Sequence, residues 1–412
     1  MDTGLQNRIN KSISQAYKGN LTADALMHLV NDCLDHPPDQ KIIHQFLDLA
    51  HIQSVAKTIS KAKLTEEWLE RIVRLIHLSQ YHTGTMIEQR AKRYGDKTVF
   101  NMIRGDDLHT LSYSDLWLKI QMTGKALSVL DRPEKPSVIG LLTYNQLNGV
   151  LVDLACLSFG IRVIPIPLNS TSEHLSFILK QSEVTHIFVG GKTAIRLWNE
   201  VHHNFDILVI ALNDSSLIQG KVMDWEIFFE NRDRSQNFDV DQRMSYVPMD
   251  RTQTIMYTSG STANPKGITF NQSNIISKRF ARALALPDFG SEDIFLCYLP
   301  LFHTFGRYFE LMGSIFWGAT YSFAESPAFN SLLKDFPIVN PSIFISIPKR
   351  WVQLYEMLEK QLDMDSEDNE TIEKKLKSIT GGKLKWGLSA AGYLDPDIFK
   401  FYQSHGVNVL SG

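Results

Sequence analysis

The stretch YTSGSTANPKG, residues 257–267, combines two glycines, five small hydroxyl or amide side chains, one proline and a single lysine. Glycine lets backbone N–H groups approach an anion closely, because it has no Cβ atom. Hydroxyl groups add further donors, and successive loop amides can form a cradle for phosphate oxygens. Lys266 supplies a positive charge that suits phosphate. The composition favours an anion-binding loop, although loops of this kind are more often plain polar turns.

The segments on both sides of the loop support anion binding. QTIMY, residues 253–257, is apolar and rich in β-forming residues, and NQSNIISKRFARAL, residues 271–284, has the pattern of a helix. A phosphate-binding loop between a strand and a helix is a recurring arrangement. The loop is not of the Walker type, because Pro265 holds the place of the second glycine and Gly267 follows the lysine. Kinase-like and GTPase-like P-loop proteins are therefore disfavoured.

Composition sets the broad class of the protein. The chain has 412 residues, of which 43% are hydrophobic and 21% charged, as in a globular protein with two or three structural units. Its formal net charge of −3 argues against bulk attraction to nucleic acid. Cys33, Cys156 and Cys297 form no metal-binding or CxxC pattern. Such spacing favours buried, reduced thiols in a cytoplasmic protein.

The sequence gives little sign of a membrane anchor. No secretory signal is visible at the N-terminus. The most apolar window, residues 150–168, is interrupted by Asp153, Arg162 and two prolines, which favours a helix, a turn and a buried strand over a membrane span. Peripheral membrane contact and the oligomeric state stay open.

Two regions with different periodicity follow one another along the chain. In residues 1–80, apolar side chains such as Leu26, Leu29 and Val30 recur at helical spacing, which predicts a small all-helical extension. We expect this extension to pack on the main domain rather than to dock a partner. From residue 82 the pattern alternates between strands and helices, which predicts mostly parallel sheets flanked by helices. The predicted fold class is therefore α/β, with boundaries at 1–80 and 82–412.

Individual elements of the α/β region can be predicted by range. Strands are expected at 137–144, 162–167, 186–190 and 206–212, and helices at 145–160 and 170–182. For the second of these helices, Ser170 and Glu173 have the spacing of a capping box.

The order Tyr-Thr-Ser-Gly-Ser-Thr-x-x-Pro-Lys-Gly resembles the phosphate-binding signature of the acyl-adenylate-forming (AMP-binding) superfamily. That superfamily includes acyl-CoA synthetases, luciferases and the adenylation domains of peptide synthetases. Nine positions agree in type, and Ala263 stands where glycine is usual. The resemblance implies an ATP phosphate site with Lys266 in a catalytic role. Its implied residues are Thr258, Ser259, Gly260, Ser261, Thr262, Lys266 and Gly267.

A second motif, LPLFHTFG at residues 299–306, contains His303 among aromatic residues. A lone histidine in such surroundings is more often a core residue. The motif nevertheless resembles the substrate pocket of carboxylate-activating members, which implies a catalytic His303 between the acyl group and the α-phosphate. The wider spacing of His303, Phe305, Arg307 and Glu310 resembles the long-chain fatty acyl-CoA synthetase branch.

The same motif bears on the substrate class. Amino-acid-activating relatives place an aspartate here to hold the substrate ammonium. This sequence has no acidic residue between Leu299 and Arg307. Because a buried unpaired ammonium is costly, a fatty acid is favoured.

A third stretch, SAAGY at residues 389–393, resembles the adenine-contacting turn, usually Ser-Gly-Gly-Ala-Pro. The implied adenine contacts are Ser389, Ala390, Ala391 and Gly392. Two alanines replace glycines, and Tyr393 replaces proline. Residues 340–358 are similar to the strand-turn-helix that forms a wall of the acyl tunnel in long-chain synthetases.

The resemblance covers residues 82–412. In the family, a Tyr-Gly-x-Thr-Glu segment that helps hold Mg²⁺ follows, and then a small C-terminal lid domain with a catalytic lysine. The chain ends at Gly412, so we expect an incomplete adenylation domain that lacks the lid, contains no metal ligands of its own and is inactive alone.

The resemblance implies a parent activity: ATP-dependent activation of a fatty acid to acyl-AMP, and transfer to coenzyme A. ATP, Mg²⁺ and coenzyme A are the implied cofactor and co-substrates, and the implied location is the cytoplasm, with peripheral membrane contact open. Two alternatives remain. One is a non-catalytic nucleotide-binding remnant, and the other is an amino-acid or aryl-acid adenylation domain.

Overall fold

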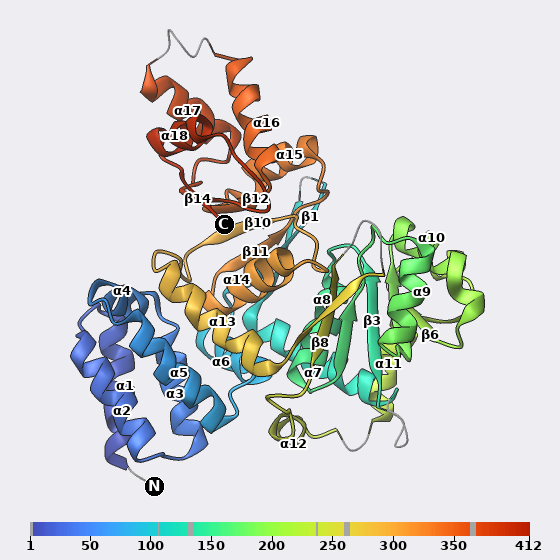
Figure 1. Ribbon diagram of the computed structural model, residues 1–412, viewed down its shortest axis with the longest axis horizontal. Helices are drawn as coiled ribbons and strands as arrows, with labels where there is room; N and C mark the ends of the chain where they lie inside the picture. The colour runs from blue at the N-terminus through green and yellow to red at the C-terminus, as the bar shows by residue number, and fades with distance from the viewer. Residues whose placement is uncertain (1–2, 106, 131–135, 236–237, 259–263, 363–367) are drawn as a thin grey trace. The chain divides into compact units, whose positions relative to one another are not determined.

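We describe the protein from a computed structural model (Figure 1). The structure describes residues 3–105, 107–130, 136–235, 238–258, 264–362 and 368–412. The chain divides into two compact units. The first comprises Met1–Gly95, Tyr113–Gly290 and Leu301–Thr304, and the second comprises Asp96–Ser112, Ser291–Pro300 and Phe305–Gly412.

The first unit begins with a helical region, as predicted. Its helices are α1 (Thr3–Tyr17), α2 (Ala23–Asp35), α3 (Gln40–Ala50), α4 (Gln53–Lys61), α5 (Thr65–Ser79) and α6 (Thr83–Tyr94). Leu26, Leu29 and Val30 are buried, so the predicted apolar face of α2 is confirmed. The boundary predicted at residue 80 stays a prediction.

Two arginines, the buried Arg90 and the partly buried Arg93, join α6 to α3. Asp48 of α3 accepts hydrogen bonds from Arg90 Nη1 at 2.5 Å and from Arg93 Nε at 2.9 Å. Arg90 is fully buried, and Asp48 is 9% exposed. His51 contacts the same carboxylate at 3.7 Å, and burial lowers its pKa well below the ordinary value. This ion-pair cluster stabilises the packing of the N-terminal helices on α6.

The N-terminal helices also contact helix α13 (Gln272–Ala285). The Ser60 hydroxyl donates to the Leu284 carbonyl at 3.1 Å, and Lys57 pairs with Asp288 at 3.1 Å. Gln272 connects α13 to α6, because its Oε1 accepts from the Thr83 N–H at 3.1 Å. The helical region therefore packs on the α/β part of its own unit.

A seven-stranded sheet forms the centre of the first unit among the described residues, in the order β7-β6-β5-β3-β4-β8-β9. Its strands are β3 (Val138–Thr143), β4 (Arg162–Pro165), β5 (His186–Gly190), β6 (Leu208–Ala211), β7 (Lys221–Asp224), β8 (Thr254–Thr258) and β9 (Lys266–Phe270). The pairs are parallel except β8–β9. Every residue of β5 is buried, as expected for a strand covered on both faces.

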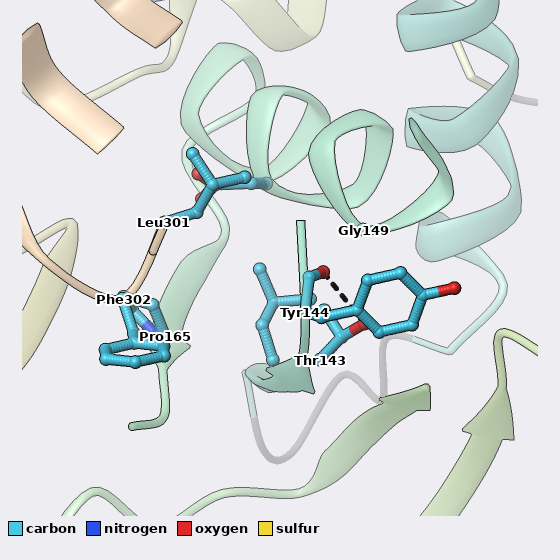
Figure 2. A pocket seen from close by; sticks show the side chains of 8 residues that line it. Thr143, Tyr144, Gly149, Pro165, Leu301 and Phe302 are labelled. Atoms are coloured by element: carbon cyan, nitrogen blue, oxygen red, sulfur yellow. Dashed lines mark hydrogen bonds between the residues drawn. The ribbon is translucent and has the colours of Figure 1, made fainter. Parts of the chain in front are cut away.

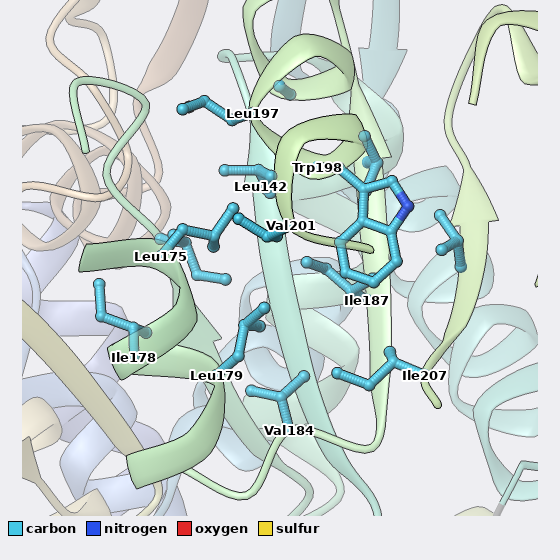
Figure 3. Packing of buried hydrophobic residues seen from close by; sticks show 14 of the residues in the cluster. Leu142, Leu175, Ile178, Leu179, Val184, Ile187, Leu197, Trp198, Val201 and Ile207 are labelled. Carbon is cyan, nitrogen blue, oxygen red and sulfur yellow. The ribbon is translucent and has the colours of Figure 1, made fainter. Parts of the chain in front are cut away.

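Helices cover this sheet, and their apolar faces form its core. They are α7 (Tyr113–Ser128), α8 (Leu147–Ser158), α9 (Ser172–Gln181), α10 (Lys192–Val201), α11 (Trp225–Glu230) and α12 (Val240–Ser245), with short 3₁₀ segments at His202–Asn204, Ser215–Leu217 and Asn231–Arg234. Figure 3 shows Leu175 of α9 and Trp198 of α10 packed over Ile187 of β5. The Trp198 indole N–H donates to the Gln219 carbonyl at 2.9 Å, so its buried polar atom is satisfied.

The second unit contains a sheet of seven strands among its described residues, in the order β14-β13-β12-β10-β11-β1-β2. Its strands are β1 (Thr98–Arg104), β2 (Asp107–Ser112), β10 (Ile294–Cys297), β11 (Thr320–Phe323), β12 (Ile343–Ser346), β13 (Trp386–Ser389) and β14 (Asn408–Ser411). Only β1–β2 is antiparallel among the described pairs.

Six helical segments flank this sheet within the described part of the chain. They are a π-helix at Phe305–Leu311 and helices α14 (Met312–Trp317), α15 (Phe329–Val339), α16 (Pro348–Glu359), α17 (Asn369–Ile379) and α18 (Pro396–Ser404). The predicted α/β fold with mostly parallel, helix-flanked sheets is confirmed.

Two smaller predictions can be compared with the structure. Cys33, Cys156 and Cys297 are buried free thiols, as predicted. The window 150–168 contains the end of α8 and strand β4, and no helix within the described residues is long and apolar enough to cross a membrane.

Candidate functional site

The predicted phosphate loop connects β8 and β9, which pair in antiparallel fashion and bring Thr258 opposite Lys266. The Thr258 hydroxyl lies 3.4 Å from the Lys266 carbonyl oxygen, to which it donates. Both side chains are exposed. The other predicted phosphate ligands, Ser259, Gly260, Ser261 and Thr262, lie outside the described residues. The structure thus brings Thr258, Lys266 and Gly267 together at the loop end of a hairpin.

The prediction that this loop stands between a strand and a helix was wrong, because strand β9 follows the loop first. Residues 266–270 read KGITF, and β-branched residues favour a strand that pairs with β8. Helix α13 begins only at Gln272, and Asn271 caps it through the Asn274 N–H at 2.8 Å. An anion at the loop would therefore be held by loop donors and Lys266, without the first turn of a helix.

A glycine is required at position 267, where β9 pairs with β8. A Cβ atom there would lie 2.8 Å from Ile255 Cγ2 and 3.2 Å from the Tyr257 ring. The Tyr257 hydroxyl lies 2.7 Å from Ser182 Oγ and donates to Gln181 Oε1 at 2.9 Å. These contacts attach the hairpin, near its loop, to the C-terminal end of α9.

The segment that contains His303, residues 301–304, belongs to the first unit. There Leu301 and Phe302 lie beside the carboxyl ends of β3 and β4. The Leu301 N–H donates to Asn145 Oδ1 at 3.1 Å. Leu301 and Phe302 line a small hollow that is partly open to solvent (Figure 2). Its other lining residues are Leu141, Thr143, Tyr144, Gly149, Asp153 and Pro165. His303, the next residue after Phe302, is exposed and is not among the lining residues of the hollow.

Sequence reasoning missed Asp153 as a residue of this hollow. Asp153 lies on α8 and is 3% exposed, so its carboxylate is buried beside Leu301 and Phe302. The expected absence of an acidic residue applied only to the local stretch from Leu299 to Arg307. A charged residue in the middle of the apolar run VLVDLACL was the available signal, since buried carboxylates are rare without a role.

The predicted adenine-contacting residues form one turn in the second unit, at the carboxyl end of β13. Ser389 pairs with Ser346 of β12 in the parallel register, and the Ala390 N–H donates to the Ser346 carbonyl at 2.9 Å. Ser389 and Ala390 are buried, whereas Ala391 and Gly392 are exposed. The Ser389 hydroxyl makes no hydrogen bond within the described part of the chain. Carboxyl ends of parallel strands are the usual place for ligands in α/β sheets.

Arg307 and Glu310 lie on the π-helix of the second unit, and both are fully buried. Burial raises the pKa of Glu310 well above its ordinary value, and the Leu299 amide opposes this only in part. Gly306 is required on this segment, because a Cβ atom would lie 2.4 Å from the carbonyl oxygens of Leu299 and Pro300. Such π-helical turns often occur at functional sites.

No group of three or more potential metal-ligating side chains occurs among the residues that the structure describes. The predicted use of Mg²⁺ therefore stays a prediction.

The chain belongs to the AMP-binding enzyme family, whose pattern matches residues 87–412. Among curated relatives, the long-chain-fatty-acid–CoA ligase ACSBG2 of Xenopus laevis is 21% identical over 306 residues, which cover 72% of this chain and 40% of that protein. The peroxisomal long chain acyl-CoA synthetase 7 of Arabidopsis thaliana is 24% identical over 307 residues, which cover 66% and 43%. The chain thus spans less than half the length of these two relatives.

A solved structure shares the fold. It is the A-PCP didomain of carboxylic acid reductase from Segniliparus rugosus in complex with AMP, with a TM-score of 0.67 and 16% identity over 81% of this chain and 52% of that one. The family match over residues 87–412 and the curated relatives confirm the predicted relation to adenylate-forming enzymes.

Proposed function

We propose that this chain provides the ATP- and acyl-binding elements of a fatty acid–CoA ligase that forms AMP. The observation that carries the proposal is the β8–β9 hairpin, which presents Lys266 and Thr258 at the ends of a loop with the family's phosphate-binding signature. The curated relatives support the proposal, since one is named a long-chain-fatty-acid–CoA ligase and the other a long chain acyl-CoA synthetase.

The chemistry explains why such residues are needed. A carboxylate resists attack by a thiol, because it is anionic and its oxygen is a poor leaving group. Attack of the carboxylate on the α-phosphorus of ATP forms acyl-AMP and releases pyrophosphate; the thiol of coenzyme A then displaces AMP. Lys266 and the loop donors would hold the β- and γ-phosphates, where charge develops on the leaving pyrophosphate. His303 would orient the acyl carboxylate, and residues 389–392 would hold the adenine.

A second candidate is an enzyme that activates an acid bearing an amino group. Asp153 favours it, because a buried carboxylate beside Leu301 and Phe302 could pair with an ammonium. The long-chain relatives favour the fatty acid, so we retain that as the main proposal.

Stable sulfamoyl mimics of the acyl-adenylate can separate the two candidates. We expect the chain to bind the decanoyl mimic at least about tenfold more tightly than the phenylalanyl mimic, because each buried methylene contributes about 0.8 kcal/mol. Isothermal titration calorimetry gives both dissociation constants. Asp153→Asn should leave decanoyl binding unchanged. Tighter binding of the phenylalanyl mimic, lost in Asp153→Asn, would establish the second candidate instead.

The remaining properties are proposals as well. Coenzyme A and a fatty acid would be the other substrates, with Mg²⁺ accompanying ATP, and no nucleic acid would be bound. A cytoplasmic location with peripheral membrane contact is consistent with the composition. If neither mimic nor ATP binds, the chain has no nucleotide site and the proposed function fails.

A further inference from the structure

We propose that Tyr298 is a positioning residue, which holds the turn at residues 389–392 through Ser346 and thereby sets the affinity for the adenine nucleotide. The effect on affinity rests on the proposed function of that turn. The mechanical part, that the Tyr298 hydroxyl holds the turn, does not depend on any ligand.

The Tyr298 hydroxyl joins the carboxyl ends of two strands. Tyr298 follows β10, and its hydroxyl lies 2.6 Å from Ser346 Oγ at the end of β12. The same oxygen accepts from the Ile347 N–H at 3.3 Å. The Ser346 carbonyl in turn accepts from the Ala390 N–H at 2.9 Å. Ser346 therefore links Tyr298 to the turn, since its side chain bonds Tyr298 and its carbonyl bonds Ala390.

The turn needs such an anchor because its backbone is strained. Ala391 has φ of +63°, in the left-handed region that a residue with a Cβ atom rarely adopts. Its side chain is exposed, so no packing of the methyl group offsets the strain. Strained backbone persists only where surrounding structure holds it. The hydrogen bond from the Ala390 N–H to the Ser346 carbonyl is next to Ala391 and can hold its strained backbone.

The hydroxyl can be removed without removing the ring. The Tyr298 ring stacks on Phe344 at 5.9 Å between centroids, and the Arg350 guanidinium carbon lies over the Tyr298 ring at 6.0 Å from its centre. Tyr298 is 9% exposed, and burial raises its pKa, so the hydroxyl stays protonated in the neutral range. Tyr298→Phe therefore deletes one polar atom and leaves the packing in place.

Hydrogen exchange in the ligand-free chain tests the mechanical part. In Tyr298→Phe, we expect the peptide that contains Ala390 to exchange roughly fivefold to tenfold faster, as for one lost buried hydrogen bond. Tyr402→Phe is the matched control, because the buried Tyr402 hydroxyl donates to the Trp351 carbonyl at 2.7 Å in the same unit, and not to Ser346. Equal exchange at Ala390 in the wild type and Tyr298→Phe would overturn the proposal.

A second variant tests the role of strain. Ala391→Gly allows the left-handed conformation without a Cβ penalty. If Tyr298 holds a strained turn, the effect of Tyr298→Phe on exchange should shrink in the Ala391→Gly background, since the two changes act on one element. Fully additive effects of the two substitutions would contradict this coupling.

AMP titration separates failure of the inference from failure of the proposed function. We expect Tyr298→Phe to bind AMP roughly fivefold more weakly than the wild type and than Tyr402→Phe. Equal AMP affinity with faster exchange would overturn the link to the nucleotide and leave the function intact. No AMP binding by the wild type would refute the adenine role of the turn, and with it the affinity part of this inference.

Discussion

Lys266→Ala is expected to weaken ATP binding roughly tenfold to a hundredfold, which corresponds to about 1.5–3 kcal/mol for hydrogen bonds to a charged group. The same substitution should leave AMP binding nearly unchanged. Lys266 lies at the loop end of the hairpin, where we place the β- and γ-phosphates, and AMP has neither. Calorimetric titration of the chain with both nucleotides measures this difference.

Lys278→Ala is the matched control for Lys266→Ala. Lys278 is an exposed lysine on α13 of the same unit, so its removal changes the net charge equally without reaching the hairpin. We expect the affinity for ATP to stay within about twofold, because exposed charges are screened by salt. An equal loss in both variants would mean that net charge, and not the site, attracts ATP. Unchanged ATP binding in Lys266→Ala would leave the loop as a polar turn.

Asp48→Asn is expected to destabilise the chain by about 3–5 kcal/mol, because removing one partner of a buried ion pair leaves an uncompensated charge. Arg90 is fully buried and would lose the carboxylate that lies 2.5 Å from it. Urea unfolding followed by circular dichroism measures the change.

Asp32→Asn is the control, since the Asp32–Arg8 pair has side chains 46% and 60% exposed. Surface pairs contribute only about 0–1 kcal/mol. Similar midpoints for the two variants would contradict a stabilising role for the cluster.

The same cluster predicts a pH dependence. Burial alone would raise the pKa of Asp48, but Arg90, His51 and Arg93 outweigh it and lower the pKa below its ordinary value. A carboxylate with a lowered folded-state pKa stabilises the fold above its unfolded pKa, and this stabilisation is lost as pH falls through the folded pKa. The wild type should therefore lose stability below about pH 4, and Asp48→Asn should show less of this loss.

The two variants also probe different parts of the molecule. Lys266→Ala should change ligand binding with little effect on unfolding, because its side chain is exposed. Asp48→Asn should change unfolding and leave nucleotide affinity nearly intact, provided that measurements are made where the protein is folded.

Much of the fold could be predicted because the central strands are apolar and buried on both faces. The expected strands at 186–190 and 206–212 correspond to β5 and β6, and the expected helix at 145–160 contains α8. Local capping was less predictable. The helix expected to start from Ser170 is α9, which is capped by Thr171 through the His174 N–H at 3.2 Å. Adjacent Ser and Thr residues are near-equivalent caps, so tertiary position decides between them.

The candidate site was predictable only where one short segment contains it. The loop of the hairpin and the 389–392 turn each have a local signature. Strand β9 was not predicted, because it depends on pairing with β8. Tyr298 gave no such signature, because its neighbours come from distant segments. Asp153 stands out locally as a charge in an apolar run, but its neighbours Leu301 and Phe302 are distant in sequence. Ser346, which bonds Tyr298, lies on another strand that only the folded sheet brings alongside.

The proposed function requires that the β8–β9 hairpin binds phosphate groups and that the 389–392 turn binds adenine. Hydrogen exchange of the chain with and without the decanoyl-adenylate mimic and pyrophosphate tests it most directly. We predict slower exchange on binding in peptides that cover residues 254–270 and 386–394, with the exposed helix α17 unchanged as an internal reference. Saturating ligand without protection at either segment would contradict this requirement.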